Sequence, residues 1–223
     1  MATRAEIDQD LCARIVSFLA REIEQKGEAS LAVSGGSTPK ELFKFLSKTE
    51  LDWEKVTVIP VDERLVTDGH PDQNGSLIKN FLLQEKAAKA KFYPLVYDAK
   101  EAENNLKQAL ENLNQVPTPI TVVVLGMGTD GHTASLFPGS SALEKGIDPN
   151  FEQELLNVTP PAAPYERISM SRNFIAKAKH IFLHFYGEEK QEVLEEVRKK
   201  ADHAQYPIYA FLTMPQLQIF NAD

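Results

Sequence analysis

Short, continuous apolar runs alternate along this chain with longer stretches in which apolar residues recur every three or four positions. The runs are rich in β-branched residues and cover positions 30–34, 56–61, 121–125 and 180–186. Runs of this length and composition are typical of strands that are buried on both faces of a parallel sheet. The chain therefore predicts an α/β fold in which helices cover both faces of a mainly parallel sheet, with 121–125 as a central strand.

The longer stretches carry apolar residues on one side and charged residues between them. This spacing predicts helices over 7–23, after Pro39, from Asn74, over 98–113 and after Gly187, with a short helix beginning at 133–135. Two further runs, 167–171 and 208–212, predict strands, the second being the last of the chain. Positions 140–164 have little regular pattern and several prolines, so we expect a long surface excursion that covers a sheet edge or acts as a lid.

Composition and charge narrow the function classes. The 223 residues include 32 acidic and 24 basic side chains, and the net charge of -8 disfavours nonspecific attraction to nucleic acid or to an anionic membrane. No apolar stretch approaches the roughly 18 residues that a membrane span needs. We expect one domain over 1–223, a cytoplasmic location, and a monomer or a weak homo-oligomer.

The cysteine and histidine positions predict no metal site. Cys12, the single cysteine, falls on the apolar side of a helical pattern, and the histidines lack the spacing of a ligand set. His184 lies inside an apolar strand pattern, which predicts a core histidine, whereas His70 lies in a polar loop, which predicts a surface residue. We expect neither a metal ion nor a bound cofactor.

The first strand runs directly into a glycine pair, two hydroxyl residues and a proline that opens a helix: Gly35, Gly36, Ser37, Thr38 and Pro39. Proline suits the first helical position, and Thr38 or Ser37 before it suits the N-cap. Free backbone N–H groups and the positive end of the helix dipole would face this loop. The pattern therefore predicts an anion-binding turn, here called the cradle, with phosphate as the expected ligand. The alternative is an ordinary strand-to-helix turn with a capping residue.

Three charged residues, Asp62, Glu63 and Arg64, follow the second strand. Charges at the end of a buried strand are costly to desolvate unless a ligand uses them or they pair with each other. A solvated loop is the alternative, and the residues alone leave both interpretations open.

The central strand is followed by three glycines, Gly126, Gly128 and Gly131, interleaved with Asp130 and His132. Ligands of open α/β sheets bind at the carboxyl ends of such strands, so these two titratable residues stand where chemistry is expected. The glycines match the G-x-G-x-x-G spacing of dinucleotide sites. We reject that function because titratable side chains occupy positions where a pyrophosphate needs bare backbone. A structural capping role is the alternative for His132.

Five segments occur in the order and context of one known family. SGGSTP (34–39), VDER (61–64), LGMGTDGHTASLFPG (125–139), RISMS (167–171) and GEEK (187–190) resemble those of 6-phosphogluconolactonases over nearly the whole chain. The segment DGHTASLFPG is the most specific, whereas SGGSTP and the D-E pair are shared with wider relatives that include glucosamine-6-phosphate deaminase. The resemblance implies a Rossmann-like three-layer α/β/α fold and hydrolysis of 6-phospho-D-glucono-1,5-lactone, a sugar-phosphate lactone, to 6-phosphogluconate in the oxidative pentose phosphate pathway.

The resemblance also implies roles for individual residues. His132 would be the base, and Asp62 would contact the substrate. The phosphate would be held by the cradle and two cations: Gly35, Gly36, Ser37, Thr38, Arg167 and Lys190.

The chemistry of these residues fits lactone hydrolysis, which needs an activated water, a site for the developing oxyanion and a hold on the sugar. An imidazole with its ordinary pKa of about 6.5 is largely neutral at pH 7, so His132 can take a proton from water, a step that contributes about 10²- to 10⁴-fold. Asp130 either orients the imidazole or binds a sugar hydroxyl. Either Arg64 or backbone N–H groups of the glycine loop would stabilise the oxyanion.

Two other functions remain open. An isomerase-deaminase of an amino-sugar phosphate would use Asp62 to move a proton between sugar carbons, but Arg64 and the TASLFPG ending argue against it. A sugar-phosphate sensor would keep the cradle without the chemistry, and the intact D-G-H segment argues against that. A serine nucleophile is disfavoured because the chain has no G-x-S-x-G elbow.

Overall fold

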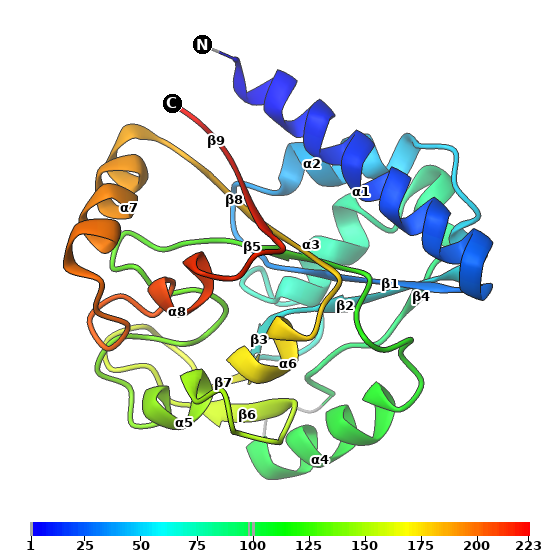
Figure 1. Cartoon of the computed structure of the whole chain (residues 1–223). Coiled ribbons are helices and arrows are strands. Elements are labelled where there is room, and N and C mark those ends of the chain that lie inside the picture. Colours follow the sequence, from blue (N-terminus) through cyan, green and yellow to red (C-terminus); the bar gives the residue numbers. More distant parts are fainter. Residues whose placement is uncertain (1, 98, 100) are drawn as a thin grey trace.

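A parallel sheet of six strands forms the centre of the computed structural model, which describes residues 2–97, 99 and 101–223 (Figure 1). The strand order is β4-β2-β1-β5-β8-β9. The strands are Ala29–Val33 (β1), Val56–Pro60 (β2), Lys91–Phe92 (β4), Val122–Leu125 (β5), His180–Tyr186 (β8) and Leu217–Ala222 (β9). All four predicted apolar runs are therefore strands, and β5 lies inside the sheet between β1 and β8, as expected for its fully buried pattern.

Helices cover both faces of this sheet, because alternate residues of each strand point to opposite sides. Leu31 and Val122 pack in one hydrophobic cluster with α1 (Arg4–Lys26), α2 (Lys40–Lys48) and α3 (Asn74–Phe81). Ala32 and Val123 face the other cluster, which contains residues of α4 (Ala102–Leu113), α5 (Leu143–Ile147), α6 (Arg172–Ala176), α7 (Glu188–Lys200) and α8 (Tyr209–Leu212). The arrangement confirms the three-layer α/β/α prediction. Two short 3₁₀ helices, Trp53–Lys55 (η1) and Glu85–Lys89 (η2), flank β2 and β4.

A second, antiparallel sheet of three strands extends one edge of the core. Its order is β3-β7-β6, with β3 at Asp62–Arg64, β6 at Leu155–Val158 and β7 at Arg167–Met170. Val61 joins the two sheets, because its N–H donates to Val33 O and its carbonyl accepts from Met170 N, both at 2.9 Å. The predicted strand at 167–171 is thus present, but it pairs antiparallel with the charged triplet rather than joining the main sheet.

The prediction of a last strand at 208–212 is wrong, because this segment forms helix α8 and the last strand is β9. Ile208 and Phe211 are fully buried and three positions apart, whereas Tyr209 and Ala210 between them are half-buried. A short apolar run fits a buried strand and a buried helix turn equally well, and here the helical spacing decides.

The predictions of a short helix at 133–135 and of a surface excursion at 140–164 are also wrong. Residues 133–135 form no helix: Thr133 pairs with Leu136 in an isolated bridge, and Ala134 has a positive φ of 51°. The segment 140–164 is not a surface excursion, since it contains α5 and β6, and residues such as Leu155 are fully buried. None of its residues lines the cleft described below.

The remaining helix prediction, 98–113, corresponds to α4, which begins at Ala102; positions 98 and 100 lie outside the described residues. In the part of the chain that the structure describes, no helix combines the length and the apolar character of a membrane span.

Candidate active site

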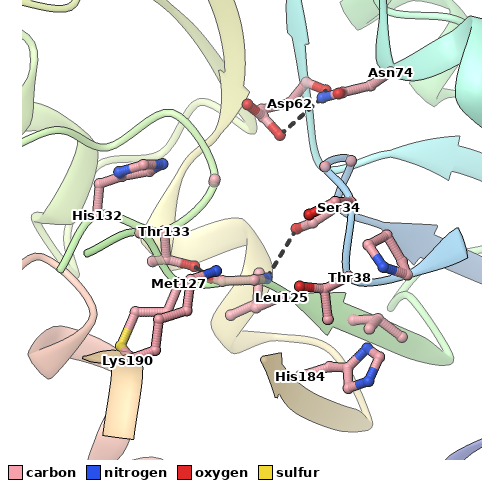
Figure 2. A pocket seen from close by; sticks show the side chains of 18 of the residues that line it. Ser34, Thr38, Asp62, Asn74, Leu125, Met127, His132, Thr133, His184 and Lys190 are labelled. Carbon is pink, nitrogen blue, oxygen red and sulfur yellow. Dashed lines mark hydrogen bonds between the residues drawn. The ribbon is translucent and has the colours of Figure 1, made fainter. Parts of the chain in front are cut away.

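A cleft opens where β1, β5 and β8 end at the same edge of the sheet (Figure 2). Nine of the ten predicted site residues line it, and the tenth, Asp130, contacts a lining residue. The nine come from five segments that are far apart in the sequence: Gly35, Gly36, Ser37, Thr38, Asp62, Arg64, His132, Arg167 and Lys190. The parallel sheet therefore brings the predicted groups to one site.

The glycine-serine turn forms one wall of the cleft. Gly36 has a φ of 99°, which favours glycine, and α2 begins at Lys40 after Pro39. The predicted N-cap is wrong, because Pro39 occupies that position and no side chain caps the helix. Thr38 and Ser37 line the cleft instead, so their hydroxyls are available to a ligand.

His132 and Asp130 form a hydrogen-bonded pair on the loop after β5. The Nδ1 atom of His132 lies 2.5 Å from Asp130 Oδ1, and the His132 backbone N–H donates to the same oxygen at 3.1 Å. The imidazole stacks on Phe137 with the ring centroids 4.2 Å apart. Because Asp130 engages Nδ1, Nε2 is the nitrogen left for a ligand in the cleft.

The electrostatics of Asp130 follow from this pair. Burial alone would raise the pKa of its carboxyl, but the hydrogen bond from His132 and the charge of that imidazole bring the pKa below its ordinary value. Asp130 therefore stays ionised and holds the imidazole in one orientation.

Gly128 is required by the close approach of this pair. A Cβ atom at position 128 would overlap the imidazole of His132 and lie 2.6 Å from Asp130 Oδ1. The backbone closes around the same contact, since Gly128 N–H donates to the His132 carbonyl at 2.9 Å.

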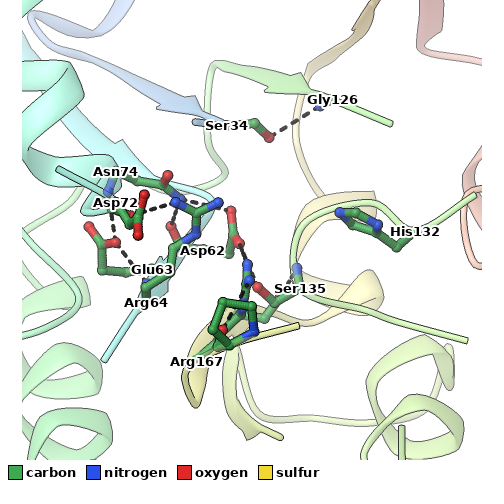
Figure 3. A network of polar contacts seen from close by, with 12 residues as sticks. Ser34, Asp62, Glu63, Arg64, Asp72, Asn74, Gly126, His132, Ser135 and Arg167 are labelled. Carbon is green, nitrogen blue, oxygen red and sulfur yellow. Dashed lines mark hydrogen bonds and ion pairs between the residues drawn. The ribbon is translucent and has the colours of Figure 1, made fainter. Parts of the chain in front are cut away.

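A buried polar network forms another part of the lining (Figure 3). Asp62 accepts a hydrogen bond from Ser135 Oγ at 2.5 Å and lies 4.0 Å from an Arg167 nitrogen. Burial lowers the pKa of the Arg167 guanidinium, and the Asp62 charge opposes that change. The guanidinium also lies over the Phe137 ring, 5.0 Å from its centroid. Phe137 thus supports both Arg167 and His132.

Two more cations face the cleft. Arg64 lies directly opposite Arg167 in the β3–β7 pair and donates through a terminal nitrogen to the Asp72 carbonyl at 2.5 Å. Lys190 lies in the first turn of α7 and is half-buried, which lowers its pKa. Among the described residues, no carboxylate oxygen lies within the 4.0 Å of an ion pair to Lys190. Its charge is therefore available for an anionic ligand.

Asn74 lines the cleft and Ser135 contacts Asp62, and the sequence predicted neither role, whereas it marked Glu63 only as one of three charged residues after the second strand. Glu63 is 1 % exposed and accepts hydrogen bonds from backbone N–H groups, while Asn74 is 2 % exposed and contacts Asp62. The sequence signal of Asn74 is that of a helix start, and Ser135 lies in a segment with an apparently helical pattern. Neither signal reveals a partner that comes from another part of the chain.

Two further histidine predictions concern His184, which also lines the cleft, and His70. His184 is 2 % exposed, which confirms a core histidine, and its Nε2 lies 3.1 Å from Asp8 Oδ1 without hydrogen-bond geometry. His70 lies at the surface with a partly exposed side chain, and its Nδ1 accepts from the Asp72 backbone N–H.

Within residues 2–97, 99 and 101–223 no group of three or more His, Cys, Asp or Glu side chains is placed to hold a metal ion. The expectation that the protein needs neither metal nor cofactor stays a prediction.

Comparison with known proteins decides the family. The family model described as glucosamine-6-phosphate isomerases/6-phosphogluconolactonase matches residues 2–219. The chain belongs to this family.

Members of the glucosamine-6-phosphate isomerase/6-phosphogluconolactonase family are similar to the chain over nearly its full length. A 6-phosphogluconolactonase of Rhizobium meliloti is 43% identical over 92% of this chain and 89% of that protein. One of Pseudomonas aeruginosa is 38% identical over 95% of this chain and 89% of that protein. The crystal structure of a 6-phosphogluconolactonase from Shewanella baltica superimposes with a TM-score of 0.96 at 36% identity, covering 100% of this chain and 96% of that one.

The contact between Gly128 and the His132–Asp130 pair yields a first prediction. In Gly128→Ala, the added methyl group displaces the imidazole from Asp130, so the downfield NMR resonance of the Nδ1 proton should disappear while the protein stays folded. Gly126→Ala is the matched control, because a Cβ there meets only the Cβ of Ser34 at an ordinary 3.9 Å. An unchanged Nδ1 resonance in Gly128→Ala would show that the loop does not hold the pair in this way.

Burial of Glu63 yields a second prediction. Desolvation raises the pKa of its carboxyl from 4.5 to about 7, against three backbone N–H donors that lower it. The unfolded chain loses this proton near pH 4.5 and the folded protein keeps it to about pH 7, so the contribution of Glu63 to stability falls as pH rises through this interval.

The expected loss of unfolding free energy is roughly 3 kcal/mol between these two pH values. Glu63→Gln removes the titrating group, so its unfolding free energy, measured with urea at pH 4.5 and 7.5, should fall less than that of the wild type. Equal pH dependence in both proteins would contradict the pKa assignment.

Proposed function

We propose that the protein hydrolyses 6-phospho-D-glucono-1,5-lactone to 6-phospho-D-gluconate, as a hydrolase of the oxidative pentose phosphate pathway. One observation carries the proposal: a His132–Asp130 pair suited to water activation opens onto the same cleft as Lys190 and the cradle at the start of α2. Relatives at 38–43% identity that are named 6-phosphogluconolactonases support the same activity.

The phosphate binds at the cradle. Backbone N–H groups of the turn and the positive end of α2 favour an anion there, and Ser37 and Thr38 add hydroxyl donors. Lys190 supplies a charge that forms no ion pair among the described residues, and Arg167 is a second cation of the same cleft. A local surplus of cations is what a dianionic substrate needs in a chain whose net charge is -8.

His132 acts as general base on the attacking water. Asp130 holds Nδ1, so Nε2 takes a proton from water as the water oxygen attacks C1 of the lactone. Arg64 lines the cleft and stabilises the negative charge that develops on the carbonyl oxygen. When the bond between C1 and the ring oxygen breaks, the imidazolium returns its proton to that oxygen and the product is the open-chain acid.

The isomerase function of the wider family fits the site less well. That chemistry would require Asp62 to carry a proton between two sugar carbons. Its carboxylate is 5 % exposed and already contacts Ser135, Asn74 and Arg167. A carboxylate with this many partners is a fixed anion, and we assign it to positioning Arg167 and contacting the substrate.

The proposal extends to location and assembly. A phosphorylated sugar does not cross a bilayer unaided, because burying its charge there is costly, so the enzyme would work in the cytoplasm where its substrate is made. The residues of one chain build the cleft, and residues 1–223 act as one lactonase-like domain. A monomer or a weak homo-oligomer therefore suffices for activity.

Replacing His132 tests the base directly. The lactone is generated in the assay from glucose 6-phosphate by its dehydrogenase, and acid release is followed above the spontaneous rate. We expect His132→Ala to lower kcat by about 10²- to 10⁴-fold with KM little changed, because general-base assistance is lost and the phosphate contacts remain. His203→Ala, at an exposed position, is the control. A wild-type kcat in His132→Ala would show that His132 is not the general base.

Replacing Lys190 tests the phosphate site. Loss of one charge-assisted contact to phosphate should raise KM about 10- to 100-fold in Lys190→Ala and leave kcat near the wild-type value. Lys177→Ala, an exposed lysine outside the cleft, should behave like wild type. Arg167→Lys keeps the charge beside Asp62 but loses the guanidinium fork, and a smaller rise in KM is expected there. An unchanged KM in both Lys190→Ala and Arg167→Lys would refute the assignment of these two residues to the phosphate site.

A further inference from the structure

The side chain of Asn74 is wedged between two parts of the cleft that come from different loops (Figures 2 and 3). Its Nδ2 donates to the Asp62 carbonyl at 2.8 Å and to Asp62 Oδ1 at 3.3 Å. Its Oδ1 occupies the space beside Gly35, so that a Cβ atom on Gly35 would overlap it. One amide group thus contacts both the phosphate cradle and the carboxylate that pairs with Arg167.

Glu63 holds Asn74 in this position. One oxygen of its carboxylate, Oε1, accepts from Asn74 N at 2.8 Å and from Arg64 N at 2.7 Å, and the other, Oε2, accepts from Gly75 N at 2.6 Å. No side chain caps α3 from its N-cap residue, so Glu63 satisfies N–H groups that the first turn of a helix leaves unpaired. The start of α3 is therefore tied to β3.

We propose that Asn74 is a positioning residue of the proposed lactonase reaction, which sets the spacing between the phosphate cradle and the Asp62–Arg167 pair, with Glu63 as its anchor. The chain of contacts runs from Gly35 through the Asn74 amide to Asp62, and from Asp62 to Arg167 and Ser135. Lys190 binds the phosphate, whereas Asn74 touches no reacting atom and acts on the substrate through the cradle and the Asp62–Arg167 pair. The substrate in this assignment is that of the proposed function. The contacts of Asn74 are those of the structure and do not depend on that function.

The test compares Asn74→Ala with Asn80→Ala, which lies at an exposed position of the same helix. Asn74→Ala keeps the backbone N–H that Glu63 binds, so α3 retains its start. Because a hydrogen bond to a charged group is lost, we expect kcat/KM to fall about 10- to 100-fold, with a lower kcat as well as a higher KM. That split differs from Lys190→Ala, where KM alone changes. Wild-type kcat and KM in Asn74→Ala would overturn the proposal.

A double variant excludes a purely structural effect. Gly35→Ala pushes a methyl group into the Asn74 amide and should impair kcat and KM by itself. Because Asn74→Ala empties that space, Gly35→Ala/Asn74→Ala should be no worse than Asn74→Ala alone. Losses that simply multiply in the double variant would show that the two residues are not coupled, and the proposal would fail.

Titration with inorganic phosphate separates this inference from the proposed function. Calorimetry should show weaker phosphate binding in Asn74→Ala than in Asn80→Ala, by about 10-fold for one lost contact. A wild-type protein that binds phosphate but does not accelerate lactone hydrolysis would refute the lactonase function only. Equal phosphate affinity in the two variants would refute the role of Asn74 at the cradle, whatever the wild-type activity.

Discussion

The parallel pairing of β1 with β5 is the constraint on which the site depends. Ala32 faces Val123 in this pair, and past the strand ends Ser34 N–H still donates to the Val124 carbonyl at 2.9 Å. The Ser34 hydroxyl then accepts from Gly126 N–H at 3.2 Å. The turn that forms the cradle and the loop that carries His132 therefore leave the sheet side by side, at the edge where parallel strands end together.

The rest of the site shows how buried charges are made tolerable. Asp62, Glu63 and Arg167 are each less than a tenth exposed, and an isolated charge at that depth is very costly. Asp62 is neutralised by Arg167 and hydrogen-bonded by Ser135, while Glu63 accepts three backbone N–H groups and has its pKa raised by burial to about 7, so that it is partly protonated near neutral pH. Apart from the hydrogen bond from Arg64 N to the neighbouring Glu63, each of these contacts joins two segments that are separated in the sequence. The network consequently stabilises the geometry of the cleft, which an enzyme needs before its substrate arrives.

Much of the fold could be predicted from the sequence, because the central strands carry β-branched runs that local pattern detects. The run 208–212 could not be assigned in this way, since its length fits both a strand and a helix turn. The helix predicted at 133–135 is absent for another reason. Ala134 adopts a positive φ that its own side chain disfavours, so tertiary contacts override the local conformational preference. In the site, motifs revealed His132, Lys190 and the cradle, which occupy recognisable positions at strand ends.

Asn74 and Ser135 could not be found from the sequence, because their significance lies in the partner that each meets. Asn74 begins a helix, and its position in the chain says nothing about Gly35 or Asp62. Ser135 is one of several hydroxyl residues, and only its approach to Asp62 distinguishes it. The roles of such residues depend on contacts between distant segments, whereas charged motifs at the ends of strands can be recognised from the sequence alone.

The central claim is spatial: phosphate at the cradle and Lys190, with the carbon under attack beside His132. A crystal structure of the protein with the product, 6-phosphogluconate, tests this claim most directly. The account predicts phosphate oxygens in contact with the 35–38 turn and Lys190 Nζ, and a carboxylate oxygen about 3 Å from His132 Nε2. Product bound with its phosphate away from the turn, or with its carboxylate out of reach of His132, would contradict the account.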